Sequence, residues 1–289
     1  MIALAAPAIL LALSLATPET PIENQVPVVS PDGSKIAFLS NRDGQNDLYV
    51  MRADGTNILR LTQSAEKESA PYWSADSRQV RYAVSGSDSS RIDSIDADGA
   101  NRKTIGTVPG RFAGISRDGA RVFVAQGTWT EVKLLLTDLD GSNPKQLTDG
   151  SSVIWSPKLS PDGKLIAFTG RDANRIQHIY IMDADGSNRR QLTHVDSAEG
   201  EAQCPAWSPD GKRIAIQTSR KDHMGSVWIV DYPSGAARKL AAHEATFEDE
   251  LPVWFPDGKR LAFQSNRSGR MEVWTMNVDG THLRQLTGL

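Results

Sequence analysis

The chain has 289 residues, and its 32 Lys and Arg against 35 Asp and Glu give a formal net charge of −3. Because basic residues are not in excess, duplex nucleic acid is not expected as a partner. The single cysteine, Cys204, excludes an internal disulfide and a cysteine-rich zinc module. With 39% hydrophobic and 23% charged residues, the composition is that of a globular protein and excludes a disordered, collagen-like or coiled-coil chain.

The first residues read as an export signal. Residues 2–16 are uncharged and rich in Ala, Leu and Ile. This run is too short to cross a ~30 Å hydrocarbon core as a helix, and its Ser-Leu-Ala end is a candidate cleavage site. No Lys or Arg precedes it, so a buried N-terminal helix or strand is the alternative. We therefore expect a signal peptide over residues 1–16, a polar leader over 17–25, no membrane span and a periplasmic or secreted protein.

The rest of the chain is one unit repeated six times. An Asp-Gly or Asp-Ser turn recurs at intervals of 42 to 48 residues, and a second turn follows about 22 residues after each first turn. Short β-branched and aromatic runs lie between these turns, which predicts four strands joined as hairpins in each unit. The first turns begin at Asp32, Asp76, Asp118, Asp162, Asp210 and Asp257.

The strands expected in the middle of each unit are apolar on both faces. Residues 36–39 of unit one, for example, read Ile-Ala-Phe-Leu without a polar alternation. A sheet with one face in water would alternate, so both faces of these sheets must be covered. Face-to-face stacking around a ring covers them. The sequence therefore predicts an all-β fold, a six-bladed β-propeller of four-stranded antiparallel blades over residues 26–289.

The units share the pattern Pro-x-Trp-Ser-Pro-Asp-Gly-Lys-x-Ile-Ala-Phe, then Ser-x-Arg, then Ile-Tyr-x-Met-Asp-x-Asp-Gly-Ser-x-x-Arg-x-Leu-Thr. This pattern resembles the TolB-type propeller repeat. Matching segments are 48–62, 179–193, 205–216 and 252–263. The resemblance covers residues 26–289 and is weakest in units two and three. It implies the propeller fold.

Two features of the TolB family's full-length members have no counterpart in this sequence. Their α/β domain precedes the propeller, and their chain ends with an extra inner strand that latches the ring. Here the sequence ends at residues 288–289, directly after the outer strand of unit six. We therefore expect the ring to be closed by another segment or by side-chain packing alone. A Tol–Pal role is not carried over from the resemblance.

Irregular loops favour one face of the expected ring, which we call the mouth face. The connections that enter units five and six are longer than the others and rich in Asp and Glu. Residues two positions before the strand-opening proline should point toward the channel mouth. We expect a protein or peptide partner here, basic where it meets the acidic rim. The expected partner-binding residues are Gln25, Glu68, Arg111, Trp129, Glu201, Gln203, Glu248, Asp249 and Glu250.

Four histidines fall on the same face of units four and five. With neighbouring carboxylates they could ligate a divalent metal. The oligogalacturonate lyases, which have a TolB-like repeat, use a histidine-rich metal site. The alternative is a solvated acidic rim with unrelated surface histidines, so no cofactor is assigned. The candidate ligands are His178, His194, His223 and His243.

Several recurring residues indicate structure rather than chemistry. Residues 96–101 and 183–188 match the start of a calcium loop but lack the Glu at its twelfth position, so we interpret them as turns. Cys204 is interpreted as a buried, inert thiol. The arginines of the second loops should pair with a neighbouring blade, and three tryptophans should lie in the core. They are Arg42, Arg171, Arg220 and Arg267, and Trp73, Trp207 and Trp254.

Motifs of the common catalytic classes are absent from the sequence. There is no nucleophile elbow, no phosphate loop and no His-Glu-x-x-His. The sequence therefore favours a monomeric scaffold without catalysis. The alternative is a metal-dependent enzyme or a glycan-binding protein, similar to a polysaccharide lyase, that uses the same face. A structural module of an envelope assembly is the third interpretation.

Overall fold

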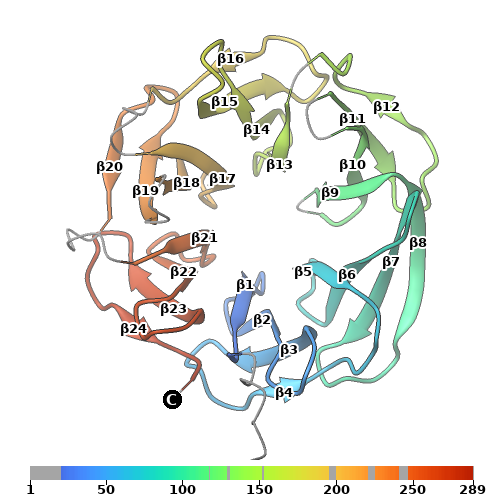
Figure 1. Ribbon diagram of the computed structural model, residues 1–289, viewed down its shortest axis with the longest axis vertical. Coiled ribbons are helices and arrows are strands. Elements are labelled where there is room, and N and C mark those ends of the chain that lie inside the picture. Colours follow the sequence, from blue (N-terminus) through green and yellow to red (C-terminus); the bar gives the residue numbers. More distant parts are fainter. Residues whose placement is uncertain are drawn as a thin grey trace, which may run out of the picture.

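The computed structural model describes residues 21–116, 118–128, 131–151, 153–194, 200–220, 225–240 and 247–288. In this part of the chain all regular structure is strand, arranged in six four-stranded antiparallel sheets around an axis (Figure 1). The predicted six-bladed propeller is confirmed. Nowhere among the described residues is there a helix of the length and hydrophobicity needed to cross a membrane.

Each blade is built from four strands that follow one another in the sequence. Blade one holds β1 (Asn24–Val29), β2 (Lys35–Ser40), β3 (Asp47–Arg52) and β4 (Leu59–Arg60); blade two holds β5 (Glu68–Trp73), β6 (Gln79–Ser85), β7 (Ser89–Asp96) and β8 (Lys103–Pro109). Blade three holds β9 (Arg111–Ile115), β10 (Arg121–Gly127), β11 (Val132–Asp138) and β12 (Lys145–Gln146); blade four holds β13 (Trp155–Leu159), β14 (Leu165–Arg171), β15 (Gln177–Asp183) and β16 (Arg190–Gln191). Blade five holds β17 (Glu201–Trp207), β18 (Arg213–Ser219), β19 (Gly225–Asp231) and β20 (Ala237–Lys239); blade six holds β21 (Asp249–Trp254), β22 (Arg260–Ser265), β23 (Glu272–Asn277) and β24 (Arg284–Gln285).

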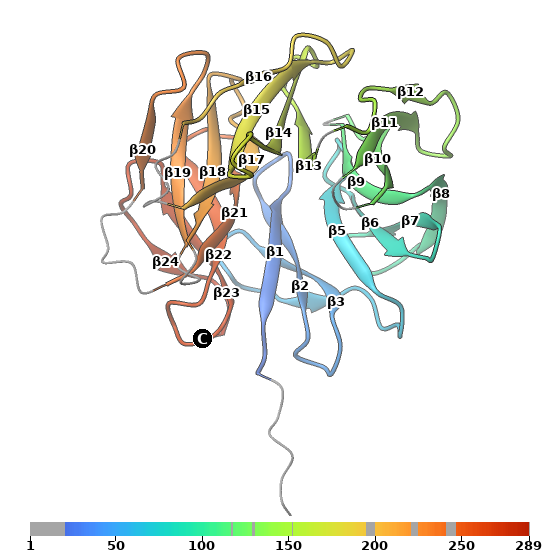
Figure 2. The ribbon, with the colours of Figure 1, turned by 45° about the horizontal axis from the view of Figure 1, so that its top comes forward.

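The first strand of every blade is the innermost one. Strands β1, β5, β9, β13, β17 and β21 therefore surround the axis (Figure 1). Figure 2 shows the ring tilted, with β1 running from one face of the ring toward the other. These six strands form the wall of the central channel and position the mouth.

The hydrophobic core consists of clusters between neighbouring blades. In β2, Ile36 and Phe38 pack against blade six, whereas Ala37 and Leu39 pack against blade two. Successive side chains of a strand point to opposite faces of a sheet, so an uninterrupted apolar run supplies both interfaces at once. This explains why the middle strands show no polar alternation.

The turn after each innermost strand is fixed by its own side chains. In blade one the Ser30 hydroxyl donates to Asp32 Oδ1 over 2.6 Å and accepts the Lys35 N–H over 2.9 Å. Gly33, at a φ of 73°, takes the left-handed conformation that the turn requires. The same Ser–Asp bond recurs at Ser74, Ser116, Ser160 and Ser208.

The Leu-Thr pair that ends most units also has a structural cause. The threonine hydroxyl accepts the N–H of a residue at the start of the third strand. This satisfies a backbone donor that the short outer strand leaves unpaired. The pairs are Thr62 with Leu48, Thr148 with Leu134, Thr193 with Ile179 and Thr287 with Val273, all at 2.8–3.0 Å.

Blades one and six meet where the ring closes. The Asn24 N–H donates to the Met271 carbonyl oxygen over 2.8 Å, and the Asn24 amide donates to the buried carboxylate of Glu272 over 2.7 Å. The Thr287 hydroxyl donates to the same carboxylate. The ring therefore closes through hydrogen bonds as well as through side-chain packing. No strand is shared between these two blades among the described residues.

Candidate functional site

The channel wall contains a recurring backbone distortion just before the strand-opening proline. In five of the six innermost strands the pre-proline residue has a φ near +50°, as at Val26 and Cys204. Non-glycine residues rarely adopt this conformation, and a β-branched residue least of all. A register shift marks the bulge in each of these strands.

Bonds to the preceding blade compensate for this strain. The rotated Val26 N–H donates to Gln264 Oε1 over 2.8 Å, and the Leu251 N–H donates to Gln217 Oε1 over 2.8 Å. Both acceptors lie on the second strand of the previous blade. The Cys204 N–H likewise donates to Thr169 Oγ1 of blade four over 3.1 Å. These three bulges thereby fasten the inner edge of one blade to the preceding blade.

The residues directly before the bulge form a ring at the mouth. In each blade this residue pairs with the equivalent residue of the second strand, as Gln25 pairs with Leu39 in blade one. All six residues are half-buried. We call them the mouth ring: Gln25, Ser69, Arg111, Trp155, Gln203 and Glu250. The sequence predicted that this position points toward the channel mouth, and the structure has it near the start of the innermost strands.

The mouth ring is electrically asymmetric. Glu250 belongs to β21 and Arg111 to β9, which lie on opposite sides of the channel (Figure 1). The side chain of Gln264 donates to Glu250 Oε2 over 2.9 Å. Burial raises the pKa of Glu250, and the neighbouring Glu248 adds to this rise. An acidic side therefore faces a basic side across the mouth.

Two of the expected rim residues are buried instead. Glu68 is 5% exposed and accepts hydrogen bonds from the hydroxyls of Thr62 and Ser64, at 2.5 and 3.2 Å. Asp249 is 8% exposed and forms an ion pair with Arg267. Because both carboxylates are buried inside their blades, we leave both residues out of the binding surface. Glu201 and Glu248 are half-buried at the mouth face, and Trp129 lies outside the described residues.

Two of the four histidines come together in blade four. The rings of His178 and His194 lie 6.4 Å apart between centroids, and His178 Nε2 lies 3.6 Å from Asp172 Oδ2. Burial lowers the pKa of His178, partly offset by Asp172. Among the described residues no group of three His, Cys, Asp or Glu could hold a metal ion. His223 and His243 lie outside the described residues.

The recurring arginines have structural contacts, but not the expected ones. The Arg42 guanidinium donates to Asn24 Oδ1 over 2.5 Å, and Arg267 pairs with Asp249. Arg171 stacks 4.9 Å from the Trp155 ring. In each case the partner lies on the innermost strand of the same blade. The expected pairing with a neighbouring blade is therefore wrong for these three, because each arginine lies at or just after the end of the second strand, beside the innermost strand of its own blade.

The two calcium-like segments are turns, as expected. Asn188 donates its side-chain N–H to Asp183 Oδ2 over 2.7 Å, and the Ser187 hydroxyl donates to Asp185 Oδ1 over 2.6 Å. Asn101 donates to Asp96 in the same way. These local bonds use the carboxylate oxygens that a calcium ion would need.

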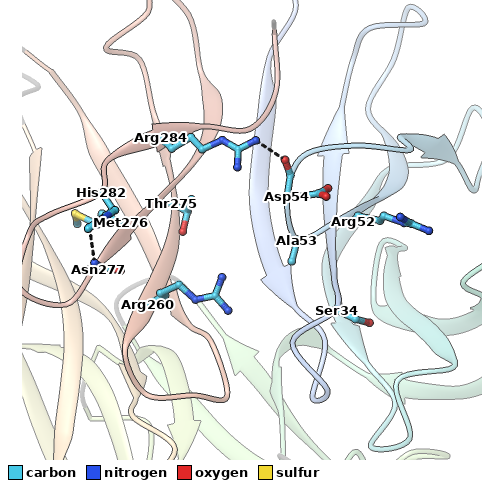
Figure 3. A pocket seen from close by; sticks show the side chains of 10 residues that line it. All are labelled: Ser34, Arg52, Ala53, Asp54, Arg260, Thr275, Met276, Asn277, His282 and Arg284. Atoms are coloured by element: carbon cyan, nitrogen blue, oxygen red, sulfur yellow. Dashed lines mark hydrogen bonds between the residues drawn. The ribbon is translucent and has the colours of Figure 1, made fainter.

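An open cleft of about 630 Å³ lies on the opposite face, between blades six and one (Figure 3). Three arginines border it. Arg284 donates to the Asp54 carbonyl oxygen over 2.8 Å, and Arg260 pairs with Asp257 at 2.8 Å. Arg52 is exposed beside them. The Arg284 bond joins the two terminal blades, so this cleft is in part the outer seam of ring closure.

A second cavity, of about 230 Å³, lies on the axis of the ring. All six innermost strands line it, and Lys158 of β13 is its one basic residue. Sequence reasoning missed Lys158. The signal was available, because a lysine follows the proline of unit four where the other units have no charged residue.

Comparisons with known proteins agree with this architecture. An uncharacterised protein of Agrobacterium fabrum is 26% identical over 65% of this chain and 67% of its own length. The Tol-Pal system protein TolB of Anaeromyxobacter dehalogenans is 28% identical over 70% of this chain, but over only 39% of its own length. This chain thus spans well under half of that relative.

Solved structures show the same fold. TolB from Acinetobacter baumannii superposes with a TM-score of 0.69 at 22% identity, over 91% of this chain and 62% of that one. An oligogalacturonate lyase in complex with manganese superposes with a TM-score of 0.62 at 15% identity, over 91% and 77%. The family model for the TolB beta propeller domain matches residues 16–130 and 118–288. The chain therefore belongs to the TolB beta propeller domain family.

Proposed function

We propose that this protein is an extracytoplasmic scaffold that binds a protein or peptide partner at its mouth face. One observation carries the proposal. Positions that build the fold recur from blade to blade, such as the Ser–Asp turn and the threonine of the Leu-Thr pair. The mouth ring does not recur: it holds five residue types in six blades. A position that the fold leaves free to vary is available for recognition.

The charge of the mouth supports a partner with basic groups on one side. Glu248 and Glu250 lie together on blade six, and Glu201 lies on the neighbouring blade five. Arg111 offers a contact for an acidic group opposite them. Such complementarity governs orientation and association rate more than affinity. The relative TolB is named as a component of the Tol-Pal system, which is consistent with a partner-binding role. The apolar run over residues 2–16 supports the extracytoplasmic location.

Capture from an envelope extract tests the proposal. The baits are the wild-type chain and two mouth variants. One mouth variant combines Glu248→Gln with Glu250→Gln, and the other is Arg111→Glu. The matched control is Arg52→Glu on the opposite face, which reverses a charge without touching the mouth. We expect a partner that wild type and R52E retain, that both mouth variants lose, and whose binding weakens as salt is raised. A partner lost only with R52E would contradict the proposal.

A metal-dependent or glycan-binding function at the same face is the second candidate. It rests on the approach of the His178 and His194 rings, which lie 6.4 Å apart between centroids, and it needs a further ligand from outside the described residues, because no group of three among the described ones could hold an ion. The lyase structure contributes only its fold at 15% identity. Calorimetric titration of Mn²⁺ and Zn²⁺ into wild type and His194→Ala tests this candidate. Metal binding that is lost in H194A supports the metal-dependent function, and the absence of metal binding in wild type excludes it.

A further inference from the structure

The cavity on the ring axis is largely apolar. Its lining comes from residues 26–28, 70–71, 112–115, 205–206 and 251–253, together with four residues whose side chains carry polar groups. These four are Tyr72, Ser156, Lys158 and Cys204. Tyr72 belongs to β5, Ser156 and Lys158 to β13, and Cys204 to β17. Three of the four polar side chains therefore lie on the neighbouring blades four and five, and Lys158 is the only one of the four that is basic.

Lys158 departs from the repeat at its own position. Each innermost strand has one residue at this ladder position, paired with the equivalent residue of the second strand. The other five blades hold Val28, Tyr72, Gly114, Ala206 and Val253 there. An uncharged residue thus satisfies the fold, and a lysine is not needed to build the ring.

The Lys158 ammonium has no hydrogen-bond or ion-pair partner among the described residues, while its backbone is held firmly. The side chain lines the channel and is accessible from within it, and desolvation inside the ring lowers the pKa of the amine. Burial raises the pKa of the nearby Cys204 thiol, so this group stays neutral and supplies no countercharge. The Lys158 carbonyl oxygen accepts the Trp207 indole N–H over 3.1 Å. A cation in apolar surroundings without a countercharge is costly, and a bound anion relieves that cost.

We propose that the channel binds a small monocarboxylate with an apolar body. The carboxylate accepts a charge-assisted hydrogen bond from the Lys158 ammonium, and the apolar body lies against the nonpolar side chains of the other blades. A ligand with a single negative charge neutralises the single Lys158 cation. The volume of about 230 Å³ is below the usual range of pockets for drug-sized ligands, so the ligand is small. This inference is independent of the partner at the mouth, because the mouth variants leave Lys158 in place.

The proposal is tested by titrating hexanoate into the full chain. Calorimetry measures binding, and thermal denaturation measures the change in melting temperature. Hexanamide has the same chain without the charge. We expect hexanoate to bind and to raise the melting temperature, with hexanamide weaker by about tenfold or more. Lys158→Met should lose hexanoate affinity by a similar factor, and Lys158→Arg should keep most of it. Lys164→Met is the matched control, since it removes an exposed lysine of the adjoining turn that does not line the cavity.

Three results would overturn the proposal: equal affinity for hexanoate and hexanamide, unchanged affinity in K158M, or no binding of acetate, hexanoate or benzoate by wild type. Misfolding does not obscure the outcome. Apolar residues occupy the same position in other blades, and K158R provides a variant that keeps the charge. Circular dichroism of each variant confirms the fold before titration.

Discussion

The indole nitrogen of Trp207 donates a hydrogen bond to the main-chain carbonyl oxygen of Lys158 over 3.1 Å, which joins the innermost strands of blades five and four. Trp73 and Trp254 make the same bond to Val28 and Ala206, at 3.0 and 2.9 Å. The tryptophan of the repeat is therefore more than a core residue. It fastens the channel wall of one blade to that of the preceding blade.

Replacing Trp254 by phenylalanine should weaken the ring. The indole is 8% exposed, and its loss leaves the Ala206 carbonyl oxygen without this donor. We expect the free energy of unfolding to fall by about 1 kcal/mol for the hydrogen bond, in addition to the cost of the smaller ring. Urea denaturation of the full chain measures the difference.

Trp228→Phe is the matched control for this prediction. The Trp228 indole nitrogen is buried and has no hydrogen-bond partner among the described residues. The same substitution there removes similar apolar area but no bond, so it should cost less. Equal losses in both variants would show that the Trp254 bond contributes nothing measurable.

The sequence predicted the blades because their signals are local and repeated. The uninterrupted run over residues 36–39 required two covered faces, and the structure places its alternate side chains against blades six and two. The arginine contacts were predicted wrongly. Recurrence indicated a structural role, but a pattern along the chain cannot distinguish Asp249 of the same blade from a residue on the next blade.

Lys158 escaped prediction for a different physical reason. The bulge before Pro157 inserts an extra residue, which is visible as a register shift between Trp155 and Lys158. Counting alternate faces across that bulge assigns the wrong side of the strand. The mouth-ring position precedes the bulge, whereas the channel-lining position follows it.

Thr193→Val should destabilise blade four. The Thr193 hydroxyl is buried and accepts the Ile179 N–H over 2.9 Å. Valine has nearly the same shape but leaves that buried donor unpaired, at a cost of about 1–3 kcal/mol. Chemical denaturation and faster hydrogen exchange of the Ile179 amide provide the measurement. Thr193→Ser, which keeps the hydroxyl, should protect this amide; an equally fast exchange in both variants would contradict the assignment.

Ser208→Ala should raise the pKa of Asp210. The Ser208 hydroxyl donates to Asp210 Oδ1 over 2.6 Å, and this bond is the main cause of the lowered pKa of Asp210. A lowered carboxyl pKa stabilises the folded state above the usual pKa of Asp, and this stability is lost as the pH falls through the lowered value. The variant should therefore be less stable than wild type at neutral pH, with a smaller difference in acid. Carboxyl ¹³C titration by NMR reports the shift, and Asp162, whose partner Ser160 is intact, should not move.

The pKa of Glu250 moves in the opposite direction and predicts the opposite pH dependence. Burial and the neighbouring Glu248 raise it, so the folded state holds a proton that the unfolded chain releases at lower pH. The stability from this group is complete below the usual pKa of Glu and is lost as the pH rises through the raised value. Glu250→Gln removes that loss, because the amide remains neutral and can still bond to Gln264. The variant should gain stability relative to wild type as the pH rises from 4 toward 7.

Denaturation of wild type and E250Q at several pH values tests the sign of this effect. Glu248→Gln provides a second test of the same effect. It removes the neighbouring negative charge, so NMR titration should find a lower pKa for Glu250 in this variant than in wild type. A stability difference between wild type and E250Q that stays constant over this range would mean that the mouth is better hydrated than the structure indicates. The Glu250 carboxylate would then be ionised at neutral pH without a penalty, and its charge would be fully available to a basic partner.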